Sequence, residues 1–345
     1  LTATDAGDGN YADGKRYATT IRIPHVGDGT INYRFHAADG SDQAIGVPIQ
    51  DQTVTTTLPV NNAPSLNWTA ASCLSDGVRP SIGAWDTDFE FMVEYTDPDN
   101  QCPTGANAIQ VWVDIDDSGT FDPNEKYDLV EDNALDVDCA DGKLYKRTMP
   151  LAVAGDGVLS YRFHATDWYE AASGPPIGGG SVTVLAALKV RPGGGTYWYT
   201  SIQSAVNDSN DPDTILVWPN SDFTPATYAE NISVLAKPNR TVRSVCGADL
   251  TSIASPGGNN TITFQDGGNG LLDGFSVTGA VNSGAKGIAI LRADNTEIRN
   301  SNIYGNTTGI EINDSDPVTV ADSKVHGNSR GIYAVSEAAS IISGG

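Results

Sequence analysis

The feature that most constrains this 345-residue chain is an internal repeat. Asp13-Gly14-Lys15 matches Asp141-Gly142-Lys143, an offset of 128 residues (141 − 13 = 128). The segments that match at the same offset are Gly27-Asp28-Gly29 with Gly155-Asp156-Gly157, Tyr33-Arg34-Phe35-His36-Ala37 with Tyr161-Arg162-Phe163-His164-Ala165, and Gly46 and Pro48 with Gly174 and Pro176. So many matches at one offset, without a gap, indicate a tandem domain duplication.

The two copies differ in extent. The second copy has a front half, residues 63–137, and the first copy has no counterpart to it. We therefore expect the chain to begin inside a repeat. A fragment of a longer protein is favoured over strands supplied by a neighbouring molecule, because an unpaired half-sandwich would expose sheet edges and an open core.

The second copy shows the pattern of an all-β domain. Short runs of β-branched and aromatic residues alternate with Gly, Asn, Asp and Pro clusters, which is typical of strands and turns. The expected strands are residues 89–95, 109–115, 126–130, 144–151 and 158–165, with Gly155-Asp156-Gly157 as the last hairpin turn. Strands at about ten-residue spacing predict a β-sandwich.

Four segments of this copy carry a resemblance. They are Asn62-Ala63-Pro64, the run Phe89 to Asp99 (FEFMVEYTDPD), Val111 to Asp116 (VWVDID) and Tyr161 to Asp167 (YRFHATD). In this order they resemble the Ig-like repeats of large bacterial and archaeal surface proteins. The resemblance covers residues 1–187 and implies a half-repeat at 1–62, a complete Ig-like sandwich at 63–187, a structural role and no catalytic residues.

One loop of the second copy has the spacing of a calcium site. Residues 114–125 read DIDDSGTFDPNE, which fits the pattern D-x-[DN]-x-[DN]-G-x5-E except that a serine stands at the fifth position. A hard cation takes six or more oxygen ligands, and alternate residues of a tight loop point inward. The expected calcium ligands are Asp114, Asp116, Ser118, Thr120 through its carbonyl, Asp122 and Glu125. The flanks are strand-like, so a structural ion is expected rather than a sensor.

The four cysteines are Cys73, Cys102, Cys139 and Cys246. Cys102 precedes one of the strands that flank the calcium loop, and Cys139 follows the other, so an antiparallel pair would bring the two together. We predict a Cys102–Cys139 disulfide, which favours an extracellular or cell-surface setting. Cys73 and Cys246 are expected to be free and buried.

The pattern changes after Leu188. Thr200-Ser201-Ile202-Gln203 can form a capping box for a short helix over residues 201–206, and short strands follow, among them 213–219, 261–264, 271–277, 287–291 and 309–312. This order is similar to the N-terminal cap and first coil of pectin-lyase-like proteins. The resemblance implies a right-handed parallel β-helix over residues 188–345.

A second period supports that interpretation. Ile303-Tyr304-Gly305-Asn306 recurs as Val325-His326-Gly327-Asn328, an offset of 22 residues (325 − 303 = 22). Repeats of this length fit one coil of a parallel β-helix, in which each coil buries its apolar face against its neighbours. Asn306 and Asn328 are expected to stack as an asparagine ladder at a turn.

Charge limits the possible partners. The formal net charge of −23 would repel nucleic acid and anionic membranes, and no apolar run approaches the length of a membrane span. We expect a structural or adhesive extracellular or cell-surface protein of a kind that can form filaments or layers. The candidate partners are copies of itself, other surface proteins and polysaccharide.

The alternatives are a polysaccharide lyase, hydrolase or epimerase acting through the β-helix, and a carbohydrate-binding protein without turnover. The charged residues of the β-helix are scattered, which disfavours catalysis. The six tryptophans could include a sugar-stacking platform, although tryptophans spread along a chain are more often core or edge residues.

Overall fold

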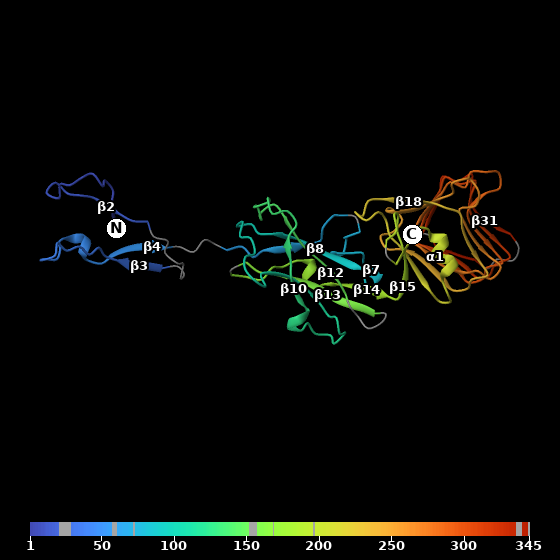
Figure 1. Cartoon of the computed structure of the whole chain (residues 1–345), viewed down its shortest axis with the longest axis horizontal. Helices are drawn as coiled ribbons and strands as arrows, with labels where there is room; N and C mark the ends of the chain where they lie inside the picture. The colour runs from blue at the N-terminus through green and yellow to red at the C-terminus, as the bar shows by residue number, and fades with distance from the viewer. Residues whose placement is uncertain are drawn as a thin grey trace. The chain divides into compact units, whose positions relative to one another are not determined.

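The computed structural model describes residues 1–20, 29–56, 61–71, 73–151, 157–167, 169–195, 197–335 and 340–343. In these residues the regular secondary structure is β-strands with a single α-helix and short 3-10 turns (Figure 1). The all-β class predicted from the sequence is therefore confirmed. The chain divides into two compact units, Leu1–Asn62 and Ala63–Gly345.

The described residues of the first unit form two small antiparallel sheets. Strand β1 (Thr2–Ala3) pairs with β2 (Tyr17–Ala18), and β3 (Gly29–Tyr33) pairs with β4 (Gln52–Thr56). A single 3-10 turn, η1 (Val47–Ile49), precedes β4. Most side chains of this unit that the structure describes are exposed.

The second unit begins with a sandwich of two sheets. The strands of the first sheet, in spatial order, are β10 (Lys126–Asp128), β9 (Ile109–Val113), β13 (Gly157–Ala165), β14 (Gly180–Leu185) and β7 (Ile82–Ala84). Those of the second sheet are β11 (Val130–Glu131), β12 (Lys143–Pro150), β8 (Asp88–Thr96) and β5 (Ser65–Asn67), with β6 (Val78–Arg79) also paired to β8.

The core of the sandwich lies between these sheets. On β8 the alternate residues Phe89, Phe91, Val93 and Tyr95 are fully buried, as the period of two predicts. They meet the inward face of β13, where the rings of Phe91 and Tyr161 lie edge to face at 5.3 Å. The aromatic residues supply much of the buried apolar area that holds the sheets together.

The predicted strand 126–130 is wrong in one respect. Its first part, β10, pairs with β9 in the first sheet, whereas its last residue begins β11, which pairs with β12 in the second sheet. Leu129 lies at the crossing and is buried in the core, and a buried apolar side chain at that point lets the chain change sheets. Gly155 and Asp156 of the expected hairpin turn lie outside the described residues.

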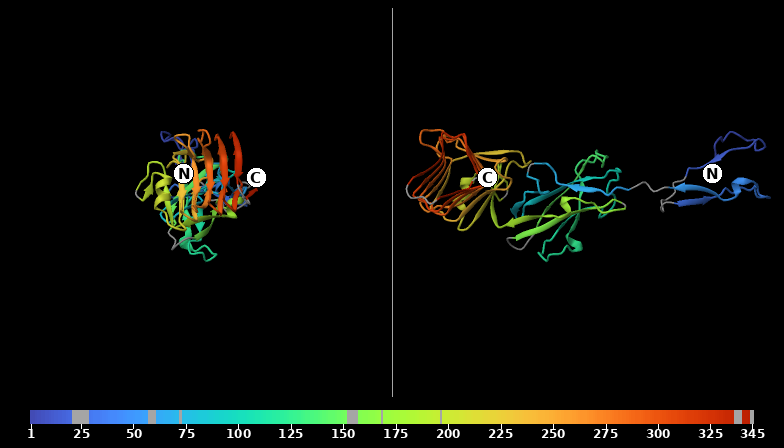
Figure 2. Two further views of the ribbon diagram at one scale, coloured as in Figure 1. Left: turned by 90° about the vertical axis from the view of Figure 1, so that its right-hand side faces the viewer. Right: turned by 180° about the vertical axis from the view of Figure 1, so that it is seen from behind.

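The chain from Ala187 onward forms three parallel sheets that wind as a right-handed β-helix (Figure 2). The first sheet contains β16 (Trp198–Tyr199), β15 (Ala187–Val190), β17 (Thr214–Val217), β20 (Arg240–Ser244), β23 (Gly270–Asp273), β26 (Thr296–Arg299), β29 (Val318–Ala321) and β32 (Ser340–Ser343). The second contains β18 (Ala226–Ala229), β21 (Thr251–Ala254), β24 (Ser276–Thr278), β27 (Asn302–Tyr304) and β30 (Lys324–His326), and the third contains β19 (Ile232–Leu235), β22 (Ile262–Gln265), β25 (Lys286–Leu291), β28 (Thr308–Asn313) and β31 (Arg330–Val335).

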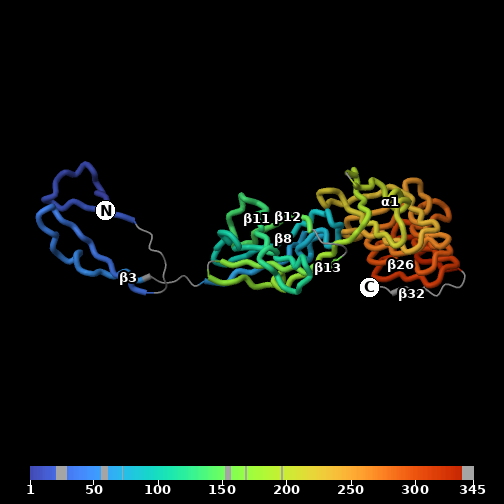
Figure 3. Tube along the Cα trace, turned by 60° about the horizontal axis from the view of Figure 1, so that its bottom comes forward, coloured from blue at the N-terminus to red at the C-terminus, as the bar shows by residue number. Residues whose placement is uncertain are grey.

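The tube in Figure 3 follows the coils from yellow to red. The 22-residue period sets the stacking of the last of them. Ile303 lies beside Val325 in the second sheet, and Ile310 lies beside Ile332 in the third. The expected asparagine ladder is present, because Asn306 Nδ2 donates to Asn328 Oδ1 at 3.1 Å. The side-chain amides of the ladder thus form hydrogen bonds at a turn between stacked coils. Without them, polar groups at this turn would be buried without partners.

A short helix covers the first coil. It spans Ile202–Asp208 (α1), and its N-cap is Ser201, whose Oγ accepts from Ser204 N at 3.2 Å. The expected capping box with Gln203 is not formed. Instead the Glu230 carboxylate, from the loop after β18, accepts the backbone N–H groups of Ile202 at 2.8 Å and Gln203 at 3.0 Å. A carboxylate at this end also complements the helix dipole.

The sandwich and the β-helix meet at a small apolar junction. Ile82 of β7 packs with Leu216, Trp218 and Val245 of the first two coils. A disulfide joins Cys73 to Cys246 with an S–S distance of 2.10 Å, so the expectation that these cysteines are free is wrong. They lie 173 residues apart in sequence, and only the docking of the sandwich on the β-helix brings them together.

The expected domain boundary at 187/188 falls at the start of β15.

Candidate metal centre and neighbouring sites

The acidic loop 114–125 connects two strands at the edge of the first sheet of the sandwich. It leaves the end of β9, passes through the 3-10 turn η2 (Pro123–Glu125) and enters β10, which pairs antiparallel with β9. Asp117 and Gly119 adopt positive φ values of 54° and 78°, as a tight loop requires at these positions. The loop is thus closed at both ends by one antiparallel pair.

Three carboxylates converge inside this loop. One carboxylate oxygen from each of Asp114, Asp116 and Glu125 lies within 4.8 Å of the other two. Asp114 and Glu125 are 4 % and 3 % exposed. Backbone N–H groups orient them, because Asp114 Oδ1 and Oδ2 accept from Ser118 and Gly119 at 2.9 Å, and Glu125 Oε1 accepts from Ile115 at 2.8 Å. Glu125 Oε1 also accepts the backbone N–H of Asp116 at 3.4 Å, whereas both oxygens of Asp114 and Glu125 Oε2 accept one N–H each and keep a lone pair for a cation.

The remaining expected ligands lie around this group. The Ser118 hydroxyl is 3.3 Å from the Thr120 carbonyl oxygen, so the fifth and seventh loop positions present neighbouring oxygens. Asp122 is not a member of the converging carboxylate group. Its backbone N–H donates to Glu125 Oε2 at 2.9 Å, which fixes the carboxylate that would close the shell.

Charge makes the cluster unusual. In the described part of the chain, none of the side-chain ion pairs includes Asp114, Asp116 or Glu125. Buried carboxylates are costly unless they are paired with a cation or coordinate a metal. A divalent ion would supply the compensating charge, and the all-oxygen set of hard donors suits calcium.

The Cys102–Cys139 disulfide lies in the same sandwich, with an S–S distance of 1.99 Å. Cys139 is fully buried, and its backbone N–H donates to the Asn100 side chain at 2.7 Å. The bond joins the loop that precedes β9 to the loop that precedes β12. It therefore crosslinks the loops on either side of the hairpin that β9, the acidic loop 114–125 and β10 form.

An aromatic and cationic cluster lies on the neighbouring strands β9, β10 and β13. The Trp112 ring stacks on His164 at 4.9 Å and lies beneath the cations of Lys126 and Arg162 at 4.2 and 4.5 Å. Burial, followed by the charges of Arg162 and Lys126, lowers the pKa of His164. His36, at the equivalent repeat position, is exposed.

A polar pocket of about 260 Å³ lies where the sandwich meets the β-helix. Its walls include Asp76 from the sandwich and Arg243, Asp273 and Asn300 from successive coils. Arg243 Nε is 3.0 Å from Asp273 Oδ2, and Asn300 Nδ2 donates to Asp273 Oδ1 at 2.8 Å. Burial raises the pKa of Asp76. Sequence spacing gave no signal for this group, because its members come from both domains.

The charged residues considered in the β-helix sequence are engaged in separate contacts. Arg292 pairs with Asp266, Arg299 with Glu297 at 2.6 Å, and Lys286 with Glu311 at 3.2 Å. His326 lies over Tyr304 and bonds Asn302 Oδ1 at 2.8 Å. The Arg299–Glu297 pair lies on the first sheet, whereas Lys286–Glu311 lies on the third sheet and Arg292 and Asp266 directly follow two of its strands.

The tryptophans have different environments. Trp68 packs edge to face on Phe163, and Trp198 packs on Trp218 at the junction. Trp85 is 64 % exposed, whereas Trp168 lies outside the described residues. Among the described residues, no helix has the length and apolarity needed to cross a membrane.

Comparison with known proteins agrees with the structure of the C-terminal part. Residues 241–344 match a family model described as a right handed beta helix region. No curated protein matches the chain. The match and the three parallel sheets together show that the C-terminal part is a right-handed parallel β-helix.

Proposed function

We infer that this chain has a structural or adhesive function at the cell surface or in the extracellular space, with calcium bound in the 114–125 loop of an Ig-like sandwich. The observation that carries this proposal is the convergence of Asp114, Asp116 and Glu125. Two of the three are buried and have no cationic side-chain partner among the residues that the structure describes, so a bound cation accounts for them better than an ordinary acidic turn.

The proposed ion would be held mainly by carboxylate oxygens of Asp114, Asp116 and Glu125. The Ser118 hydroxyl, the Thr120 carbonyl and Asp122, directly or through water, would complete the shell. Because the ligands come from both ends of the loop, calcium would tie the end of β9 to the start of β10. Its role would be to stiffen the sandwich rather than to react.

Other features support an extracellular location. All four cysteines are in disulfides, which persist in oxidising compartments. The net charge of −23 favours solubility among divalent cations. A sandwich fixed to a β-helix by a disulfide and an apolar junction suits a rigid element of a filament, a layer or an adhesin.

The test is unfolding of the full chain in calcium chloride and in EDTA. At about one hundred times the dissociation constant, calcium should raise the free energy of unfolding of the sandwich by about 2.7 kcal/mol. Glu125→Gln should abolish the difference, because the closing carboxylate is lost. Asp117→Asn is the matched control: it removes a charge from the same loop, and asparagine tolerates the positive φ of Asp117.

Identical unfolding in calcium and EDTA would overturn the proposal, as would an equal effect of both variants. The catalytic alternative is tested with the same protein by incubation with acidic and neutral polysaccharides in calcium buffer. Release of cleavage products would replace the structural function with an enzymatic one and would direct attention to Asp76 and Asp273 in the polar pocket.

A further inference from the structure

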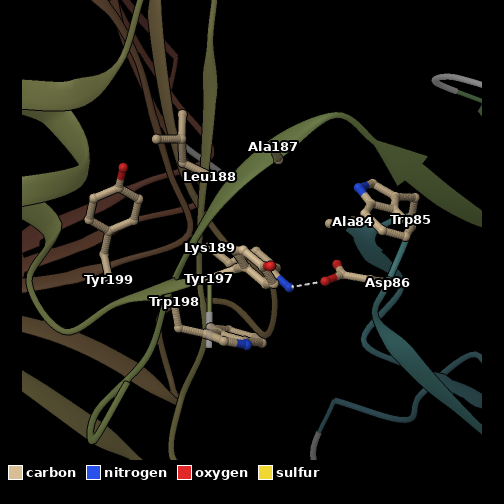
Figure 4. Close-up of a pocket in the computed structure, with 9 residues that line it drawn as sticks. All are labelled: Ala84, Trp85, Asp86, Ala187, Leu188, Lys189, Tyr197, Trp198 and Tyr199. Atoms are coloured by element: carbon tan, nitrogen blue, oxygen red, sulfur yellow. Dashed lines mark hydrogen bonds and ion pairs between the residues drawn. The ribbon is translucent and has the colours of Figure 1, made fainter. Parts of the chain in front are cut away.

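A second pocket lies on the junction between the sandwich and the β-helix, in the same compact unit. Its volume is about 640 Å³. The loop after β7 contributes Trp85 and Asp86, β15 contributes Lys189, and β16 with the residue before it contributes Trp198 and Tyr197 (Figure 4). Neither domain forms this pocket alone.

Aromatic rings dominate its surface. Trp85 and Tyr197 are 64 % and 85 % exposed. Rings that are this exposed contribute little to packing of the protein core. Trp198 is held more firmly, since it lies edge to face on Trp218 at 4.9 Å and beneath the cations of Lys189 and Arg191 at 4.6 and 4.3 Å. Tyr199 also lines the pocket and is half-buried, so the two accessible rings are those of Trp85 and Tyr197.

The backbone of Tyr197 is held in an unfavourable conformation. Its φ is 62°, in the left-handed region that bulky side chains avoid and glycine adopts freely. Such strain concentrates at binding and catalytic sites. Packing of the Tyr197 side chain in the core does not compensate for this strain, because Tyr197 is the most exposed aromatic residue that lines the pocket.

Polar groups stand between the two walls. Lys189 Nζ is 2.6 Å from Asp86 Oδ2, a contact drawn as the dashed line in Figure 4. Among the described residues that line this pocket, Lys189 is the only cationic one, and it is already paired with Asp86. The exposed part of Asp86 can accept hydrogen bonds from hydroxyl groups of a ligand. A ligand that carries carboxylates would be repelled by the net charge of −23 of the chain.

From this arrangement we propose that the junction pocket binds a neutral saccharide. The apolar faces of pyranose rings stack on Trp85 and Tyr197, and ring hydroxyls donate to Asp86. Apolar walls with a few placed polar groups are the usual composition of small-molecule sites. The pocket shares no residue with the acidic loop, so this inference and the calcium proposal stand or fall separately.

The experiment is titration calorimetry of the full chain with β-1,4-linked hexasaccharides of glucose, mannose and N-acetylglucosamine, with a galacturonate hexamer as the acidic comparator. The wild type should bind at least one neutral probe more tightly than the acidic one. Trp85→Ala should weaken that binding about tenfold, as expected for an exposed aromatic anchor.

Tyr197→Gly separates binding from structure. It removes the ring and relieves the positive-φ strain, so binding should weaken about tenfold while the melting temperature stays equal or rises. Tyr169→Ala is the matched control, because Tyr169 is 55 % exposed on the sandwich outside the pocket, and it should bind like the wild type.

Three results would overturn the proposal. The first is no binding of any neutral probe at millimolar concentrations. The second is binding of the galacturonate hexamer alone. The third is binding that Trp85→Ala and Tyr197→Gly leave unchanged, or that Tyr169→Ala weakens equally.

Discussion

The hairpin β3–β4 and the hairpin β13–β14 are the same structure in two different surroundings. Gly29 pairs with Thr56 in the first, and Gly157 pairs with Val184, each 128 residues later, in the second. The loop bridges Ala38–Gln43 and Thr166–Ala171 are also equivalent. The register of the strands is therefore set by the local sequence, whatever covers the hairpin.

Burial distinguishes the two copies. Tyr33 and Phe35 are each 44 % exposed, whereas Tyr161 and Phe163 are each 1 % exposed. Both pairs of rings keep the same edge-to-face contact, at 5.8 and 6.0 Å. In the second copy the sheet with β8 and the Trp68 ring cover them, and the described residues of the first unit contain no such sheet. Pairing is thus local, but a core needs the second sheet.

The largest expected difference comes from removing a ring in each copy. Phe163→Ala should lower the free energy of unfolding of the sandwich by about 3–5 kcal/mol, because it leaves a cavity between two sheets. Phe35→Ala should change stability by no more than about 0.5 kcal/mol. Tryptophan fluorescence in urea measures the first effect, since all six tryptophans follow residue 62.

Hydrogen exchange along β3 and β13 measures both effects in one experiment. Exchange should accelerate strongly in β13 of the Phe163 variant and remain nearly unchanged in β3 of the Phe35 variant. Equal acceleration in the two strands would show that the first hairpin is also covered in solution. The two hairpins would then not differ in burial.

A smaller effect is expected from the covalent link that only the second copy has. Replacing Cys73 and Cys246 with serine should destabilise the junction by about 2–4 kcal/mol, because the bond closes a separation of 173 residues. In calorimetry the sandwich and the β-helix should then melt at separate temperatures.

The Cys102→Ser, Cys139→Ser variant serves as the control for this link. Its bond lies within the sandwich, so its loss should lower the melting of the sandwich without releasing the β-helix. A Cys73–Cys246 variant that still melts as one unit would show that the apolar junction alone couples the two domains.

The smallest effect concerns the repeated histidine. Burial lowers the pKa of His164 below its ordinary value of 6.5, so the unfolded chain binds the proton more readily. The contribution of His164 is fully present above pH 6.5 and is lost as pH falls through the lowered folded pKa. The loss should be only a few tenths of a kcal/mol, since solvent screens a half-buried ring.

Urea unfolding between pH 5 and 7 measures this contribution as a difference between variants. His164→Gln should flatten the pH dependence relative to the wild type, and His36→Gln, at the exposed equivalent position, is the matched control. A His164 variant whose pH profile coincides with that of the wild type would exclude this linkage.

Much of the fold could be predicted because its signals are local. Alternation along β8 and the 22-residue spacing of Ile303 and Val325 each reflect the side-chain period of one element. The acidic loop was visible for the same reason, as its converging carboxylates lie within twelve residues. The strand at 126–130 was less predictable, because the change of sheet at Leu129 depends on a core that two sheets share.

The sequence by itself determined the repeat, the β-helix period and the spacing of the acidic loop, since each is fixed by residues close together along the chain. Only the tertiary structure decided that Cys73 bonds to Cys246, that Glu230 caps α1, and that Trp85 and Tyr197 line one pocket. The physical reason is distance along the chain. Such contacts depend on how the sandwich docks on the β-helix and how the coils stack, and no local period encodes that geometry.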